Sequence, residues 1–336
     1  MTDRIVLAYA GGLTAAAAIP WLAGVYGAAV VTLTLDLGQG SDLDEVRDLA
    51  LAAGAVRAHV LDVREAFARD FVLPALRAGA LYEGRDPMAA ALGQPLIVKS
   101  LLEVASIEQA TAVAHGCTGL DCERMEASAR ALNPDIRVIA TARADEPSQG
   151  AGANLWGRVY ASTPQGPDAE SPTARPRSQL LEEAPDTPAL VEIAFEGGVP
   201  VAINGVPMAL TELIESLSII AGQHGVGRIT AGESDVAGTR SRRVCEAPAA
   251  VVLHAAHAAL EAVALPRELT RHAHDGAAEY AHLVWNGRWF TAAREARDAS
   301  NAKAQENMTG SVRMTLFKGT LRSSEAAVLD HAVPLA

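Results

Sequence analysis

Apolar, β-branched runs alternate with helical patterns over the first 141 residues, an alternation that predicts parallel strands joined by helical crossovers. We expect strands at 4–9, 28–35, 58–63, 112–115 and 136–141, and helices at 14–26, 41–53, 64–78 and 95–111. Pro20 is expected to interrupt the first helix, and Pro95 to lie in the first turn of the last one. Ser41-Asp42-Leu43-Asp44 resembles a capping box. The pattern therefore predicts an α/β fold with a doubly wound parallel sheet in residues 1–143.

The pattern changes after that sheet. Residues 144–188 hold seven of the chain's 17 prolines together with many Ser, Gly and Ala residues, which predicts a linker without regular structure. A second, α+β domain is expected at 189–336, where two apolar runs flank Glu196-Gly197-Gly198 as in a hairpin. Its other expected elements are helices at 208–224, 248–264, 267–284 and 291–305 and a strand at 311–317.

The loop after the first strand is the first candidate site. Gly11 and Gly12 can turn the chain without a steric penalty and let backbone N–H groups approach an anion at the start of the next helix. The following residues, Thr14, Ala15 and Ala16, offer one hydroxyl and no charge. A tight strand-to-helix turn in any parallel-sheet protein has the same pattern, so the loop alone leaves both interpretations open.

Composition limits the other classes of function. A length of 336 residues suits two domains, and the formal net charge of −12 argues against nucleic acid or an anionic membrane as the main partner. Three cysteines cannot all pair, and Cys117 and Cys122 lack a second ligand pair for a metal. We expect a cytoplasmic protein because the sequence has neither a secretory signal nor an apolar run of roughly 18 residues.

Seven motifs in order resemble the argininosuccinate synthase family. The glycine loop, Ala8 to Ala16, is similar to the family's Ala-Tyr-Ser-Gly-Gly-Leu-Asp-Thr-Ser. The others are Asp36-Leu37-Gly38-Gln39, Ala80 to Arg85, Ala114-His115-Gly116-Cys117-Thr118-Gly119, Asn154 to Arg158, Gly198 to Gly205, and Glu246 to Ala250. The resemblance implies a nucleotide-binding domain of the ATP-pyrophosphatase type, and an enzyme that adenylates citrulline with ATP and Mg²⁺ before aspartate displaces AMP.

The resemblance also implies which residues contact the nucleotide: Ala8, Gly11, Gly12, Leu13, Thr14 and Gly116. Several polar groups of the family's loop are missing, however. Ala10 replaces a serine, Thr14 an aspartate, and Ala15-Ala16 a Thr-Ser pair. Each lost charge-assisted hydrogen bond is worth ~1.5–3 kcal/mol. We therefore expect ATP binding to be weakened or absent.

On the substrate side, the resemblance implies contacts from Thr118, Asp121, Arg124 and Glu233. Other family positions have changed. Asp86 and Cys245 replace tyrosines, Leu120 an asparagine, and Gln94 an arginine; serines map to Gly150 and Val159, Leu35 replaces an alanine, and Ala91 is ambiguous. No catalytic residue and no metal ligand is assigned. Ordinary citrulline–aspartate ligation is accordingly expected to be lost or altered.

Structural interpretations compete with these roles. Arg124 and Glu126 lie two apart on a predicted helix and do not face each other, so each is equally well explained as a solvated surface charge. His254 and His257 have the spacing of a metal pair, but core or surface histidines are expected because no third ligand is nearby. Trp156, Arg158 and the 246–250 stretch are explained by turns and packing.

Three functional hypotheses follow from the sequence. The first is a repurposed ATP-dependent ligase, and the second is a non-catalytic homologue that binds a ligand or a partner enzyme. Residual argininosuccinate synthase activity is the third and weakest. The expected ligand is a small amino-acid-like molecule. We also expect a homo-oligomer, or an association with another biosynthetic enzyme.

Overall fold

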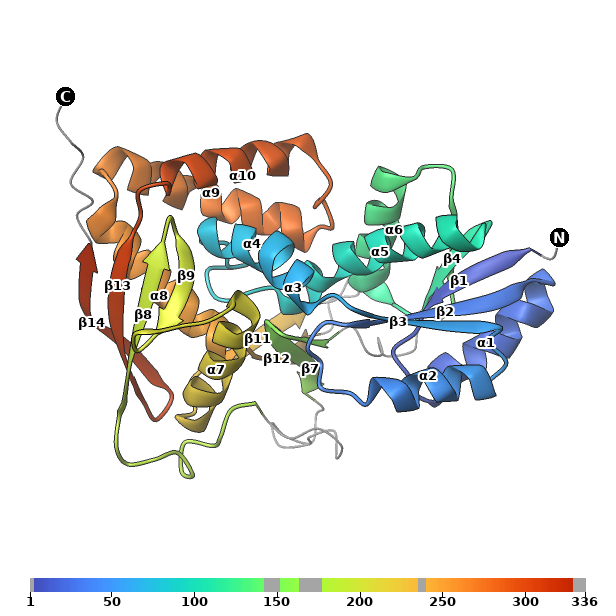
Figure 1. Ribbon diagram of the computed structural model, residues 1–336, viewed down its shortest axis with the longest axis horizontal. Coiled ribbons are helices and arrows are strands. Elements are labelled where there is room, and N and C mark those ends of the chain that lie inside the picture. The colour runs from blue at the N-terminus through green and yellow to red at the C-terminus, as the bar shows by residue number, and fades with distance from the viewer. Residues whose placement is uncertain (1–2, 142–151, 163–176, 235–239, 329–336) are drawn as a thin grey trace. The chain divides into compact units, whose positions relative to one another are not determined.

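Two compact units make up the described part of the chain. The computed structural model describes residues 3–141, 152–162, 177–234 and 240–328 (Figure 1). The first unit combines residues 1–67, 88–155 and 282–295, and the second combines residues 68–87, 156–281 and 296–336. Each unit is therefore assembled from stretches that are distant in sequence.

A five-stranded parallel sheet forms the centre of the first unit. Its strands are β1 (Arg4–Ala8), β2 (Ala29–Asp36), β3 (Arg57–Asp62), β4 (Ala112–His115) and β5 (Arg137–Ala140). The spatial order is β3-β2-β1-β4-β5, and every pairing is parallel. The predicted doubly wound sheet is confirmed. The strand order reverses between β1 and β4, which is where such sheets bind ligands.

Helices cover both faces of this sheet. Figure 1 shows α1 (Leu13–Tyr26) and α2 (Leu43–Ala52) on one face, and α5 (Ala89–Glu108) and α6 (Gly119–Leu132) on the other. Ile19 and Leu22 of α1 pack in a buried apolar cluster with Ile5 and Leu7 of β1. The short elements α3 (Arg64–Phe67) and β6 (Ala153–Asn154) also belong to this unit.

Three sequence predictions about these helices were wrong in detail. Pro20 lies inside α1 without ending it, and Pro95 lies inside α5, which begins at Ala89. Met88 precedes α5 with a left-handed backbone (φ 58°) that no composition rule indicates. Asp42, not Ser41, caps α2: its carboxylate accepts hydrogen bonds from the N–H groups of Asp44 and Glu45.

Helix α5 is fixed by its carboxyl-terminal end. The buried carboxylate of Glu108 accepts hydrogen bonds from Arg4 Nη1 (3.0 Å), Arg57 Nη1 (2.6 Å) and His59 Nε2 (2.8 Å). Burial alone would raise the pKa of Glu108, but the bonds from His59 and Arg57 hold it below its usual range. Because Arg4 and Arg57 begin β1 and β3, the other end of α5 lies at the carboxyl edge of the sheet.

The second unit is a mixed assembly of helices and antiparallel strands. One sheet has the order β10-β9-β8-β13-β14. It contains β8 (Ala189–Glu196), β9 (Val199–Ile203), β10 (Val206–Pro207), β13 (Gly310–Phe317) and β14 (Thr320–Val328). Alternate residues Val191, Ile193 and Phe195 of β8 are buried. Strand β8 pairs antiparallel with β9, which confirms the predicted hairpin. In addition, β7 (Gly157–Ser162), β11 (Arg228–Ser234) and β12 (Arg240–Glu246) pair as antiparallel strands.

The remaining helical elements are η1 (Ala68–Val72), α4 (Leu73–Arg77), α7 (Leu210–Gln223), α8 (Pro248–Ala264), α9 (Arg267–Trp285) and α10 (Ala292–Ala304). Strands β7, β11, β12 and β14 were not predicted. Strands β6 and β7 lie within the predicted linker, and residues 142–151 and 163–176 of that region lie outside the described residues. Among the described helices, α5 has the length and composition of a membrane span, but 67% of it is buried inside the fold, as in a core helix.

Candidate functional site

The predicted site residues gather where β1 and β4 end. The two strands are neighbours, with Leu7 opposite Ala114, so the loops that follow them start side by side. Ala8, the last residue of β1, is half-buried. The loop after β1 contains Gly11 and Gly12, and the loop after β4 contains Gly116 and Thr118. The point between β1 and β4, where the strand order of the sheet reverses, is thus flanked by both candidate loops.

Gly11 and Gly12 differ in what surrounds them. Both have left-handed φ angles, 85° and 88°. A Cβ on Gly11 would lie 3.1 Å from Val46 Cγ2, whereas no atom of the described residues lies within 4 Å of a Cβ built on Gly12. At Gly11 a side chain is therefore disfavoured by conformation and would also press on the Val46 side chain. Gly12 faces open space, as a backbone approached by a ligand would.

Backbone N–H groups are the main binding groups of this loop. Gly12 caps α1, and in the described structure no side chain caps this helix end. The N–H groups of Leu13, Thr14 and Ala15 belong to the first turn, where helices have no internal acceptor. Thr14 is exposed. The arrangement provides N–H donors at the positive end of the helix dipole for an anionic group.

The loop after β4 is held by His115. Its carbonyl accepts hydrogen bonds from Thr141 N (2.9 Å) and Oγ1 (3.2 Å), and its Nδ1 accepts from Cys117 N at 3.3 Å. Burial lowers the pKa of His115, with the charge of Glu126 opposing, so the ring is neutral at pH 7. A Cβ on Gly116 would make only ordinary contact with Thr141, so described neighbours do not require glycine there.

The thiol of Cys117 is not a nucleophile. Burial, with a smaller contribution from the negative charges of Asp121 and Cys122, raises its pKa to about 12. It therefore stays protonated at physiological pH. Thr118 caps α6 in extended conformation and is half-buried, with no side-chain capping bond in this described segment.

Asp121 and Arg124 form a network with Gln94. Asp121 Oδ1 accepts hydrogen bonds from Gln94 Nε2 (2.7 Å) and Arg124 Nη1 (2.8 Å). The Arg124 guanidinium also donates through Nε to the carbonyl of Trp285 (2.5 Å) and lies over its ring. Arg124 is only 2% exposed, so its interpretation as a solvated surface charge was wrong. A role of Arg124 as carboxylate ligand stays a prediction.

Replacing Arg124 with methionine distinguishes a structural role of this residue from a role in ligand binding. Methionine keeps the length of the side chain but removes the bonds to Asp121 and Trp285. We expect the free energy of unfolding to fall by about 1.5–3 kcal/mol, the usual worth of charged hydrogen bonds. Urea denaturation measures this, and Arg130→Met, at an exposed position of α6, is the control. Unchanged stability with weakened ligand binding would instead assign Arg124 to the ligand.

Other predicted or replaced positions lie elsewhere. Glu233 is in β11 of the second unit, opposite Ser241, and its side chain is outside what the structure describes. Asp86 is buried and exchanges backbone hydrogen bonds with Tyr82. Ala91 and Cys245 are also buried, in α5 and β12. Gly150 lies outside the described residues.

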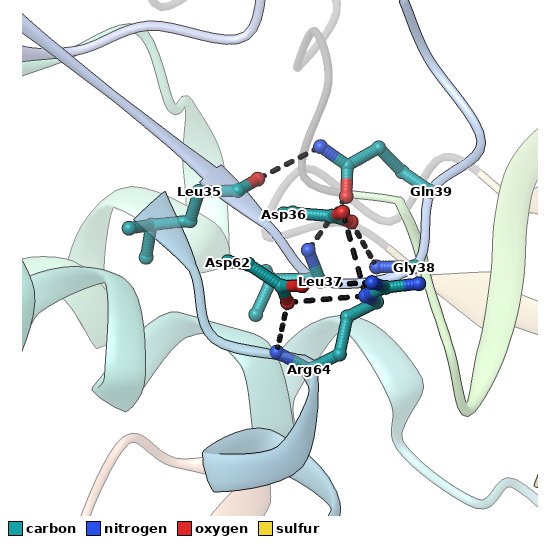
Figure 2. A network of polar contacts seen from close by, with 7 residues as sticks. All are labelled: Leu35, Asp36, Leu37, Gly38, Gln39, Asp62 and Arg64. Atoms are coloured by element: carbon teal, nitrogen blue, oxygen red, sulfur yellow. Dashed lines mark hydrogen bonds and ion pairs between the residues drawn. The ribbon is translucent and has the colours of Figure 1, made fainter. Parts of the chain in front are cut away.

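The loop Leu35 to Gln39 folds upon itself (Figure 2). Gln39 accepts from Leu37 N (2.7 Å) and donates to the Leu35 carbonyl (2.8 Å), and Asp36 accepts from Gly38 N (2.9 Å). Arg64 joins this loop to Asp62, because its Nη2 donates to Asp62 Oδ2 at 2.7 Å. The Nε atom of Arg64 lies 3.4 Å from Asp36 Oδ2. This motif therefore shapes the carboxyl end of β2, a role that the sequence alone did not reveal.

Gly38 is the most constrained residue of that loop. Its φ is 82°, and a Cβ there would lie 3.0 Å from Leu155 Cβ and 3.1 Å from Leu155 Cα. We expect Gly38→Ala to reduce the free energy of unfolding by about 1–3 kcal/mol. The matched control is Gly40→Ala, which has a φ of 78° but no described neighbour within 4 Å. Equal losses in urea denaturation would show that the Leu155 contact is unimportant.

His254 and His257 of α8 have the sequence spacing of a metal-binding pair. Within the described part of the chain, no cluster of three or more His, Cys, Asp or Glu residues has the geometry to hold a metal ion. His254 and His257 are buried in the second unit, where burial lowers their pKa values to about 3 and about 4. His257 Nε2 lies 3.1 Å from Gln305 Oε1. The burial and the bond to Gln305 favour the interpretation of both residues as histidines of the core over that of a metal pair.

Comparisons with known proteins agree with the fold. The family described as "Arginosuccinate synthase N-terminal HUP domain" matches residues 4–154, and "Arginosuccinate synthase C-terminal domain" matches residues 153–333. The chain belongs to the argininosuccinate synthase family. It is 44% identical to argininosuccinate synthase of Symbiobacterium thermophilum, over 98% of this chain and 92% of that relative.

Similar relatives occur in other bacteria. The argininosuccinate synthases of Geobacillus kaustophilus and Bacillus pumilus are each 42% identical, over 94% of this chain and 84% or 85% of theirs. The argininosuccinate synthase HUP domain is of the ATP-pyrophosphatase type and coincides with the parallel sheet, which confirms the predicted fold class. Membership in the argininosuccinate synthase family does not by itself assign this chain's substrates.

Proposed function

We propose that this chain is an ATP-dependent carbon–nitrogen ligase of the argininosuccinate synthase type in which the citrulline–aspartate reaction is lost or altered. The observation that carries the proposal is the Gly11-Gly12 loop. Both glycines have left-handed φ angles, and no described atom lies within 4 Å of a Cβ built on Gly12. Of the four polar loop positions implied by the family resemblance, three are alanines here and the fourth is Thr14. Nucleotide binding would then depend on backbone N–H groups.

These groups have defined tasks in the proposed reaction. The N–H groups of Gly12, Leu13 and Thr14 would bind phosphate oxygens, where charge accumulates during adenylation. Mg²⁺ is usually held by phosphates and one or two carboxylates, so it would arrive with ATP and neutralise part of its charge. Thr118 and Asp121 would orient the second substrate. The assignment of Ala8, Gly116 and Glu233 to ligand contacts is part of the same proposal.

Calorimetry and a pyrophosphate assay test this function. Titration with ATP and Mg²⁺ should give measurable heat, and citrulline plus aspartate should release pyrophosphate far more slowly than with the Symbiobacterium thermophilum relative as control. Absence of ATP binding would refute the ligase proposal. A rate equal to that of the relative would show that the parent reaction persists, and complementation of an arginine auxotroph gives an independent readout.

A non-catalytic homologue is the second candidate. It is favoured by the engagement of Arg124 with Asp121 and with the carbonyl of Trp285. Such a protein would bind a small ligand or another biosynthetic enzyme without turnover. Release of pyrophosphate with any pair of carboxamide and amine substrates would exclude it. A cytoplasmic location and a homo-oligomeric assembly stay predictions.

A further inference from the structure

Gln94 presents a buried acceptor atom beside the candidate site. The residue is 1% exposed, and its Nε2 donates to Asp121 Oδ1 at 2.7 Å. Because an ionised carboxylate only accepts hydrogen bonds, this contact fixes which end of the amide is which. The oxygen, Oε1, is therefore directed away from Asp121, and among the described residues it has no hydrogen-bond partner.

The position of Gln94 relates this atom to ligand binding. Glu108 holds the far end of α5 against the first residues of β1 and β3, so Gln94 lies toward the carboxyl edge of the sheet. The adjacent Gly93 lies close to Leu37, which directly follows β2. Asp121 is in the first turn of α6, immediately after the Gly116–Thr118 loop. The acceptor therefore belongs to the edge where doubly wound sheets bind ligands.

The start of α6, which supplies Asp121 to Gln94, carries more negative than positive side chains. The first two turns of α6 contain the carboxylates of Asp121, Glu123 and Glu126 and one cation, Arg124. That cation already donates to Asp121 and to the Trp285 carbonyl. The negative field is also felt by Cys117, whose pKa is raised by burial and then by Asp121. A second carboxylate brought here would meet repulsion, and an N–H donor would meet acceptors.

We propose that Gln94 and Asp121 form a subsite for an N–H donor of the second substrate, either an ammonium or a carboxamide, in place of a carboxylate. The inference rests on the proposed ligase function and names the substrate class for its amine-binding side. An unsatisfied buried acceptor costs free energy, so a ligand that supplies the donor gains affinity over one that does not. Gln94 is then a residue that determines specificity.

The test compares amino acids that differ only at the end of a short side chain. Isothermal titration of the full-length protein, saturated with ATP and Mg²⁺, would use asparagine, 2,4-diaminobutyrate and aspartate as probes. We expect at least one of the two donor-bearing probes to bind about tenfold more tightly than aspartate. Asparagine preference would identify an amide donor, and diaminobutyrate preference an ammonium.

Two variants test whether Gln94 causes the preference for the donor-bearing probes. Gln94→Met removes both the Oε1 acceptor and the Nε2 bond to Asp121 with little change in side-chain length. It should abolish the tenfold preference while the ATP affinity stays within twofold. Lys99→Met, on the exposed side of α5, is the matched control and should change neither. If Gln94→Met does not fold, the preference of the unmodified protein decides the matter alone.

The outcomes separate the two proposals. Failure of the unmodified protein to bind ATP refutes the ligase function. Normal ATP binding with aspartate bound as tightly as the other probes overturns only the subsite. A preference that survives Gln94→Met also overturns it, because a group other than Gln94 would then distinguish the probes.

Discussion

Replacing Glu246 with alanine is expected to lower the free energy of unfolding by about 3–5 kcal/mol, the usual cost of breaking a buried ion pair. Glu246 is fully buried in β12. Its carboxylate accepts from Arg158 Nη2 (2.7 Å), Ser178 Oγ (2.8 Å) and Arg177 N (3.1 Å). It thus joins β7 and the segment at Arg177 to one strand, and alanine would remove all three contacts at once.

Urea denaturation with two controls measures this effect. Glu246→Gln keeps the shape and the acceptor oxygen but not the charge, so it should lose about 1–3 kcal/mol. Glu325→Ala removes a carboxylate that pairs with Arg313 at 2.8 Å on the exposed face of β13 and β14, and it should leave the denaturation midpoint nearly unchanged. Similar losses for Glu246→Ala and Glu325→Ala would contradict the argument.

The Glu246 contribution should also depend on pH. Burial alone would raise the pKa of Glu246, but the bonds from Ser178, Arg177 and Arg158 outweigh it and hold the pKa below its usual value. A carboxylate whose pKa is depressed in the folded state stabilises above its unfolded pKa, and this stability is lost as pH falls through the folded pKa. The advantage of the unmodified protein over Glu246→Gln should therefore shrink in acid. A difference independent of pH would argue against an ionised Glu246.

Substitution of Gly12 by alanine is expected to weaken ATP binding at least tenfold. At φ 88° and ψ 161° Gly12 occupies a conformation that is almost restricted to glycine, so alanine would force the loop to move and misplace its N–H donors. The loss of stability should be limited to the strain of about 1–3 kcal/mol, because a Cβ there meets no described atom within 4 Å. Calorimetry with ATP and urea denaturation measure the two effects.

Gly11→Ala serves as the matched comparison. Its φ of 85° is similar, but its Cβ would press against Val46 at 3.1 Å. It should therefore destabilise the protein more than Gly12→Ala, and the double variant Gly11→Ala/Val46→Ala should recover part of the difference. If Gly12→Ala bound ATP normally, the backbone donors of this loop would not be the nucleotide contacts.

The parallel sheet could be predicted because its strands are short apolar runs separated by helical patterns, as in β1, β2 and β4. Strand β12 was missed because it begins with the polar run Arg240-Ser241-Arg242-Arg243, and β11 because it contains Gly232 and only two apolar side chains, Ile229 and Ala231. The start of α5 was misplaced because a buried helix can contain Pro95, so tertiary packing overrides the local rule.

The candidate site was predictable only in part. Gly11, Gly12 and Gly116 follow strands whose order in the sheet places their ends together, and sequence patterns indicate such loops. The hydrogen bond between Arg124 and Trp285 joins residues 161 positions apart, and no local pattern reports it. The sequence likewise does not indicate the unpartnered acceptor on Gln94, because that feature depends on how Asp121 orients the amide.

The long separation in sequence between Arg124 and Trp285 also affects how the chain folds during translation. Residues 282–295 complete the first unit, yet they are translated after most of the second. At ~5–20 residues per second, roughly 8–32 s pass between the synthesis of Arg124 and that of Trp285. During this interval a nascent α6 carries a cation whose final carbonyl acceptor does not yet exist. The first unit can therefore reach its native form only after residues 282–295 have been synthesised.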